Sequence, residues 1–157
     1  MKIIPVLHNV YSSQRVVEAA RLVYGLGLDT FVVTKASGSA AQSGVPDAQK
    51  YALKRGLNFL FLKDLKDALE LLNPDVVLTF SEGKYGGERL SSLLESDTLR
   101  GKERVVAVFG GAEPGLTLQE FKMGLHVFPD KIEDDIGSVG LMAISLYVLL
   151  NNLQEKM

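Results

Sequence analysis

The stretch RVVAVFGGAEPGLTLQEF, Arg104 to Phe121, runs from an apolar strand pattern through a glycine-rich turn into a helix start. Gly110, Gly115 and Thr117 nearly complete the phosphate-binding motif GxxxxGK[ST], but Leu116 stands where the motif has its lysine. A triphosphate bound there would lose its closest cation. The turn therefore predicts a site for a ligand other than ATP.

Strand-like and helix-like segments alternate along the whole chain. Such alternation predicts an α/β fold with a mostly parallel sheet and helices on both faces, formed by residues 1–157 as a single domain. The predicted strands cover residues 3–7, 30–33, 58–62, 75–80, 104–109 and 125–128. The predicted helices cover residues 12–24, 47–55, 65–72 and 88–94, with two more beginning at residues 118 and 138.

Composition limits the function classes. The chain has 157 residues, 46% hydrophobic, with a net charge of −2, which argues against a sequence-wide electrostatic grip on nucleic acid. It has no cysteine, which rules out disulfides and thiolate metal sites and favours a reducing, cytoplasmic environment. The longest apolar run, Val139 to Leu150, is shorter than the roughly 20 residues that cross a bilayer. We therefore expect no membrane span.

Glycine, serine and acidic residues collect in loops that follow predicted strands, at residues 35–44, 81–88 and 109–116. A fourth candidate loop, residues 129–140, precedes the last helix. Ligands of open α/β sheets bind outside the carboxyl ends of the strands. We therefore expect these loops to face one pocket, with the basic residues Lys35, Lys84, Arg89 and Lys122 near it as candidate ligand contacts.

Three motifs together resemble the SPOUT superfamily of RNA methyltransferases, in particular its SpoU-like branch. They are HNVYSSQRVVEAARLVYGLGLDTFVV (8–33), VVAVFGGAEPGL (105–116) and the pair LHVFP and DIGSVGLMAISLYVLL (125–150). Two departures stand out. Glu113 lies one place later than the family's glutamate, and Gly140 replaces the asparagine after Ser138.

The resemblance implies a C-terminal trefoil knot, S-adenosylmethionine as cofactor, and 2′-O-ribose methylation of tRNA or rRNA. S-adenosylmethionine carries no phosphate, so backbone groups and apolar walls suit it better than a lysine, and glycines let the main chain approach it. The catalytic candidates are Arg15, then Arg21, with Asn9 and Glu113. The cofactor-binding candidates are Thr79, Phe80, Ser81, Gly110, Gly111, Gly115, Leu125, Val127, Phe128, Ile136, Ser138 and Val139.

Several of these residues could have a purely structural role instead. Asn9 could cap the helix that begins near Ser12, and Glu113 could sit at a helix start where negative charge is favourable. Each arginine could be a surface residue. His8 and His126 are too far apart in sequence to signal a metal site, and no metal site is predicted.

Two alternative functions remain open at the sequence level. Pro74-Asp75 followed by Glu82 and Lys84 supplies the residue types of PD-(D/E)xK nucleases, in which two carboxylates bind Mg²⁺ and a lysine steadies the attacking water. A second E-x-K occurs at Glu120 and Lys122. The missing asparagine makes a third class plausible, a knotted domain that binds RNA or protein without catalysis.

The last predicted helix indicates self-association. Val139 to Leu150 is apolar almost all round, which exceeds what one buried helix face needs. We expect a symmetric homodimer in which Arg15 or Arg21 of one subunit completes the site of the other.

Overall fold

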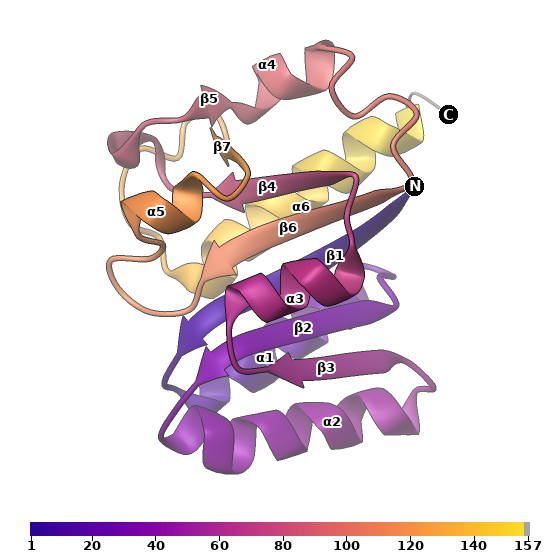
Figure 1. Cartoon of the computed structure of the whole chain (residues 1–157), viewed down its shortest axis with the longest axis vertical. Coiled ribbons are helices and arrows are strands. Elements are labelled where there is room, and N and C mark those ends of the chain that lie inside the picture. The colour runs from indigo at the N-terminus through magenta and orange to yellow at the C-terminus, as the bar shows by residue number, and fades with distance from the viewer. Residues whose placement is uncertain (156–157) are drawn as a thin grey trace.

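A seven-stranded parallel sheet forms the centre of the computed structural model, which describes residues 1–155 (Figure 1). The strand order is β3-β2-β1-β6-β4-β7-β5. The strands are β1 (Lys2–Val10), β2 (Thr30–Ala36), β3 (Asn58–Leu62), β4 (Val76–Phe80), β5 (Glu88–Arg89), β6 (Arg104–Gly110) and β7 (Leu125–Phe128). The predicted α/β class with a mostly parallel sheet is confirmed.

Helices cover both faces of the sheet, as predicted. They are α1 (Ser13–Gly25), α2 (Val45–Lys54), α3 (Leu65–Leu72), α4 (Leu90–Glu95), α5 (Leu118–Phe121) and α6 (Ser138–Glu155). Apolar residues of α1, α2, α4 and α6 pack on one face of the sheet, and those of α3 and α5 pack on the other. The strands are apolar on both sides because both sides are buried.

The central strand β1 shows this division residue by residue. Ile3 and Leu7 belong to the larger core, and Ile4 and Val6 belong to the smaller one. Successive side chains of a strand point to opposite faces. His8 therefore shares the face of Ile4 and Val6, on the side of α3 and α5.

Two elements differ from the sequence prediction. The segment Ala40–Gly44 forms a π-helical turn that runs directly into α2, so the second half of the predicted 35–44 loop is helical. Gly44 permits this packing, because a Cβ there would lie 2.9 Å from the Cα of Ser13. Residues 88–89 form β5 beside β7 before α4 begins. A strand of two residues is too short to show the alternating apolar pattern by which strands are predicted from sequence.

The final helix is less evenly buried than its sequence suggests. Leu141, Met142, Leu146 and Leu149 are buried, whereas Tyr147 is 62% exposed. Among the described residues, no helix is long and apolar enough to span a membrane. The trefoil knot stays a prediction.

Candidate active site at the carboxyl edge of the sheet

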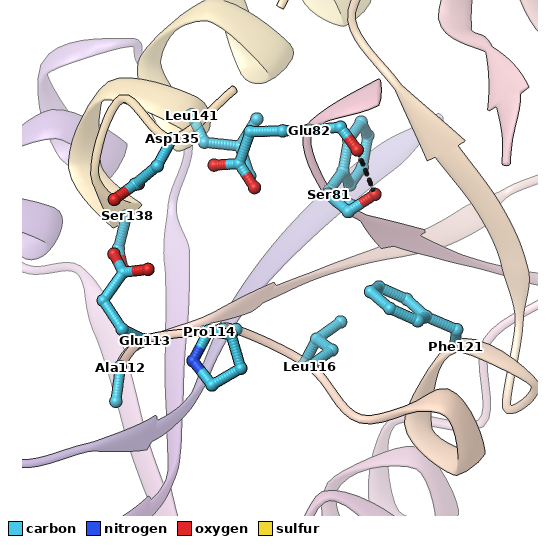
Figure 2. A pocket seen from close by; sticks show the side chains of 13 residues that line it. Ser81, Glu82, Ala112, Glu113, Pro114, Leu116, Phe121, Asp135, Ser138 and Leu141 are labelled. Carbon is cyan, nitrogen blue, oxygen red and sulfur yellow. Dashed lines mark hydrogen bonds between the residues drawn. The ribbon is translucent and has the colours of Figure 1, made fainter. Parts of the chain in front are cut away.

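The carboxyl ends of β4 and β6 border a small cleft, closed by the loop between β6 and α5 and by the start of α6 (Figure 2). Its volume is about 20 Å³, little more than one water molecule requires. Phe80 and Phe109 stack beneath it with ring centroids 4.7 Å apart. The lining residues are Phe80, Ser81, Glu82, Gly110, Ala112, Glu113, Pro114, Gly115, Leu116, Phe121, Asp135, Ser138 and Leu141.

The glycines of the 110–117 loop serve close packing of the chain against itself. A Cβ on Gly110 would lie 2.7 Å from the Cα of Gly115, and one on Gly111 would lie 2.7 Å from the Cβ of Val10. Gly115 has φ +105°, a conformation that favours glycine. The tight turn in the sequence is thus explained by the loop folding back on β6 and β1.

Carboxylates from three segments meet at the cleft. Glu82 follows β4, Glu113 lies in the 110–117 loop, and Asp135 precedes α6; Figure 2 shows all three side chains around the same opening. Glu82 is only 8% exposed. Among the described residues, none donates a hydrogen bond to its carboxylate. A buried carboxylate without a donor is unusual because desolvation penalises its charge.

The pKa of the Glu113 carboxyl is raised by its surroundings in the cleft. Desolvation raises the pKa of the Glu113 carboxyl, as do its hydrogen bond and charge repulsion with Asp135 and the charge of Glu82, while Arg15 acts in the opposite direction. Like charges held together favour the protonated form of one of them. The cleft therefore combines a carboxyl that retains its proton to higher pH, that of Glu113, with the buried side chain of Glu82.

Arg15 is the cation beside these acids. Its Nη1 donates a hydrogen bond to the Gly111 carbonyl at 2.6 Å. It extends from the first turn of α1, where Ser12 caps the helix by accepting the Arg15 N–H. Arg15 thus contacts the 110–117 loop of its own chain.

Ser81, which lines the cleft, pairs with His126, which does not. The Ser81 hydroxyl donates to the Glu82 carbonyl at 2.8 Å, and Ser81 Oγ lies 2.6 Å from His126 Nε2. The His126 ring stacks on Phe121 with centroids 3.9 Å apart, and burial lowers the pKa of His126. The neutral imidazole is therefore the favoured partner of Ser81.

The structure brings some of the predicted site residues to the cleft. Of the cofactor-binding candidates, Phe80, Ser81, Gly110, Gly115 and Ser138 line it. Of the catalytic candidates, Glu113 lines it and Arg15 borders it. The functional roles assigned to these residues stay predictions.

Other predicted residues lie elsewhere. The Thr79 hydroxyl donates to the Phe121 carbonyl, which makes it part of the packing of α5. Arg21 lies in a shallow groove with Tyr51 and with Val139, another cofactor-binding candidate. Outside the cleft lining also are Gly111, Leu125, Val127, Phe128 and Ile136.

Asn9 does not take the predicted capping role, and its catalytic role stays a prediction. It does not line the cleft, and Ser12 caps α1 in its place. Asn9 has φ 64° and a buried Oδ1 without a partner in the described part of the chain. Likewise, the 35–44 loop contributes no residue to the cleft, because its second half is the helical turn that packs on α1.

The residues of the PD-(D/E)xK pattern do not assemble. Asp75 precedes β4 and accepts hydrogen bonds from the backbone N–H groups of Glu103 and Arg104 at 2.9 and 3.0 Å. Glu82 follows the same strand, so the two acids flank its opposite ends, roughly 20 Å apart in an extended chain. Lys84 pairs with Asp134 at 2.6 Å on the surface. The described residues contain no group of three His, Asp or Glu placed to hold a metal ion.

Sequence reasoning missed the cleft role of two acids. Glu82 entered only as part of the nuclease pattern, and Asp135 was one of several acids in a polar loop. The sequence did offer one signal, which was position: Glu82 comes just after a strand and Asp135 just before a helix, at the carboxyl edge of the sheet.

A larger hollow of about 460 Å³ lies near the amino ends of β1 and β6. It is lined in part by Met1, Leu99 and Leu153, and none of the predicted site residues lines it.

The fold defines the class of protein: an α/β domain with the fold of SpoU-type methyltransferases. One solved structure, titled "Structural insights into the 2-OH methylation of C/U34 on tRNA", matches with a TM-score of 0.74 at 17% identity, covering 98% of this chain and 97% of that one. The SpoU methyltransferase AviRb from Streptomyces viridochromogenes, in complex with AdoMet, matches with a TM-score of 0.70 at 10% identity, over 99% of this chain and 58% of that one. At these identities the likeness shows the fold.

The family to which the sequence belongs is described as a nuclease family and not as a methyltransferase family. The chain belongs to the family described as RecB-family nuclease (DUF2122), whose profile matches residues 38–148. It is 47% identical over 150 residues to "Putative type II restriction enzyme ApeKORF2002P" of Aeropyrum pernix, covering 96% of this chain and 94% of that protein. It is 40% identical to "Putative type II restriction enzyme MjaORF1200P" of Methanocaldococcus jannaschii, covering 90% and 91%.

These relatives correct the main functional prediction. The SPOUT resemblance captured the fold, but the inferred S-adenosylmethionine-dependent RNA methyltransferase activity is wrong, because the family and both close relatives are described as nucleases or restriction enzymes. The nuclease alternative had the better support. Both kinds of comparison support an enzyme.

Proposed function

We propose that this chain is a nuclease that hydrolyses phosphodiester bonds of nucleic acid at the Glu82–Glu113–Asp135 cleft. The observation that carries the proposal is family membership across residues 38–148 together with acids from three segments at the carboxyl edge of the sheet. Open α/β sheets place their ligands at this edge.

The metal site of the PD-(D/E)xK pattern does not fit the residues as placed. Asp75 is held at the far end of β4 by two backbone N–H groups, and the described residues contain no group of three His, Asp or Glu, the cleft acids included, placed to hold a metal ion. The proposed reaction is therefore written with the groups of the chain itself.

Hydrolysis needs a proton acceptor for water and a proton donor for the leaving oxygen. Glu82, buried and without a hydrogen-bond donor, is placed to take the proton of a water molecule as its oxygen bonds to phosphorus. Glu113, whose pKa is raised by desolvation and by Asp135, is suited to protonate the oxygen that leaves as the old P–O bond breaks. Arg15, whose charge acts on Glu113, would supply positive charge to a phosphate bound at the cleft.

Adjacent aspartates allow a sharp test. Asp135 lines the cleft, whereas Asp134 is exposed and pairs with Lys84. We expect Glu82→Gln and Asp135→Asn to reduce cleavage of labelled nucleic acid by roughly 100-fold or more, and Asp134→Asn to leave it within about twofold. DNA and RNA, each with Mg²⁺ and with EDTA, form separate arms. Unchanged cleavage in both cleft variants, or none by the unmodified chain in any arm, contradicts the proposal.

Binding of S-adenosylmethionine to the chain should be measured beside the cleavage assays. Structural neighbours of the chain include AdoMet complexes, but typical small-molecule pockets measure about 300–1,000 Å³, far more than this cleft of about 20 Å³. Binding would require the 110–117 loop to move away from α6. Calorimetric titration measures this binding independently of cleavage.

We also propose that the chain forms a homodimer through α6. Ile144, Tyr147 and Val148 are between 37% and 62% exposed on that helix. Exposed apolar clusters of this kind mark interaction surfaces, and a two-fold axis buries the same face of both copies.

A further inference from the structure

We propose that His8 is a positioning residue of the candidate active site, which fixes the loop carrying Glu113 from behind without touching the cleft. The inference rests on the proposed function and assigns to it a residue that neither the motifs nor the cleft lining indicate. His8 is 3% exposed at the end of β1.

The 110–117 loop is attached to His8 at both ends. At its start, the Gly111 N–H donates to the His8 carbonyl at 2.7 Å. At its end, Glu120 Oε1 accepts the Thr117 N–H at 2.8 Å, while Glu120 Oε2 lies 2.6 Å from His8 Nε2. Glu113, Pro114 and Gly115 lie between these two anchors.

The pKa of Glu120 decides which atom donates the hydrogen bond between His8 and Glu120. Burial acts to raise the pKa of Glu120, but the hydrogen bond from the Thr117 backbone and the adjacent His8 together lower it. The carboxylate is therefore ionised and accepts, so His8 Nε2 carries a hydrogen and donates. The other ring nitrogen, Nδ1, lies 2.8 Å from the Thr34 hydroxyl on β2, which fixes the ring plane.

Because the loop is short, fixing its two ends also restricts the position of Glu113. Five residues separate Gly111 from Thr117, so fixing both ends leaves the loop little freedom to carry Glu113 away from Asp135. Misplacing a catalytic group by about 1 Å can cost roughly 100-fold in rate. Positioning by His8 therefore predicts an effect on the chemical step with little effect on substrate binding.

The test compares His8→Phe, which keeps a ring but has no donor, with His8→Gln, which keeps a donor. The first readout is the ¹³C NMR titration of the Glu113 carboxyl, and the second is kcat against KM for cleavage. We expect His8→Phe to bring the Glu113 titration toward that of an ordinary glutamate and to lower kcat by roughly 10- to 100-fold, with KM within about threefold. We expect His8→Gln to retain most of both.

Thr34→Val is the matched control, because it removes the other ring contact and leaves the Glu120 link in place. If His8→Phe does not fold, Glu120→Gln carries the test, since Glu120 is partly exposed. An unchanged Glu113 titration in a folded variant overturns the positioning role. If the unmodified chain cleaves nothing, the proposed function fails, and the titration still decides the role of His8.

Discussion

At the scale of single residues, Asp75 has a structural role that its place in a nuclease-like pattern conceals. The backbone N–H groups of Arg104 and Glu103 lower the pKa of its carboxyl, which ties β4 to the start of β6. The stability due to this group is complete above its ordinary pKa and is lost as pH falls through the lowered value. We expect Asp75→Ala to lower the melting temperature at pH 7, with a smaller difference below pH 3, and to leave the cleavage rate per folded molecule unchanged.

Thermal melts across pH, with cleavage assayed well below the melting point, measure both effects. If the Asp75→Ala variant folds but cleaves no substrate, Asp75 has a role in catalysis and the purely structural role is wrong.

His126 also makes the fold less stable as pH falls, but in a higher pH range than Asp75. Burial lowers the pKa of its imidazole, so the unfolded chain takes up the proton first as pH falls below about 6.5. Unfolding free energy should therefore decrease from pH 7.5 to pH 5.5. We expect His126→Gln, which can still bond Ser81, to reduce this decrease. Urea unfolding at the two pH values measures it, and an equal decrease in the variant argues against this account.

At the scale of elements, the glycine turn after β6 determines whether the cleft exists. A Cβ on Gly110 would meet the backbone of Gly115 at 2.7 Å, and backbone cannot yield as a side-chain tip can. We expect Gly110→Ala to destabilise the fold by about 1–3 kcal/mol and to reduce cleavage. Gly25→Ala is the matched control, since a Cβ there meets nothing within 4 Å, and its melting temperature should be unchanged or higher.

At the scale of the whole molecule, the exposed side of α6 decides whether the protein is a dimer. Tyr147 is 62% exposed in the middle of that helix, and a charge buried at a two-fold interface would face its own copy. We expect the chain to sediment as a dimer at micromolar concentration and Tyr147→Glu to sediment as a monomer. Leu53→Glu, at a 73% exposed position on α2, should not change the mass. A monomeric unmodified chain refutes the interface.

The sequence by itself determined the alternation of strands and helices and the parallel sheet, because periodicity and turn residues act over a few neighbours. It also located the 110–117 loop; the roles of Arg15 and Glu113, and the completion of one subunit's site by the other, stay predictions. The same local signals could not show that residues 40–44 are helical, since that turn depends on the close approach of Gly44 to α1.

Tertiary structure alone decided which acids lie together and what holds the loop that carries Glu113. Asp75 and Glu82 are close in sequence but flank opposite ends of one strand, whereas Glu82, Glu113 and Asp135 come from distant segments to one cleft. His8 and Glu120 are 112 residues apart and in contact. A parallel sheet brings the carboxyl ends of separate strands to one edge whatever their order in the chain, so spacing along the sequence carries no record of these contacts.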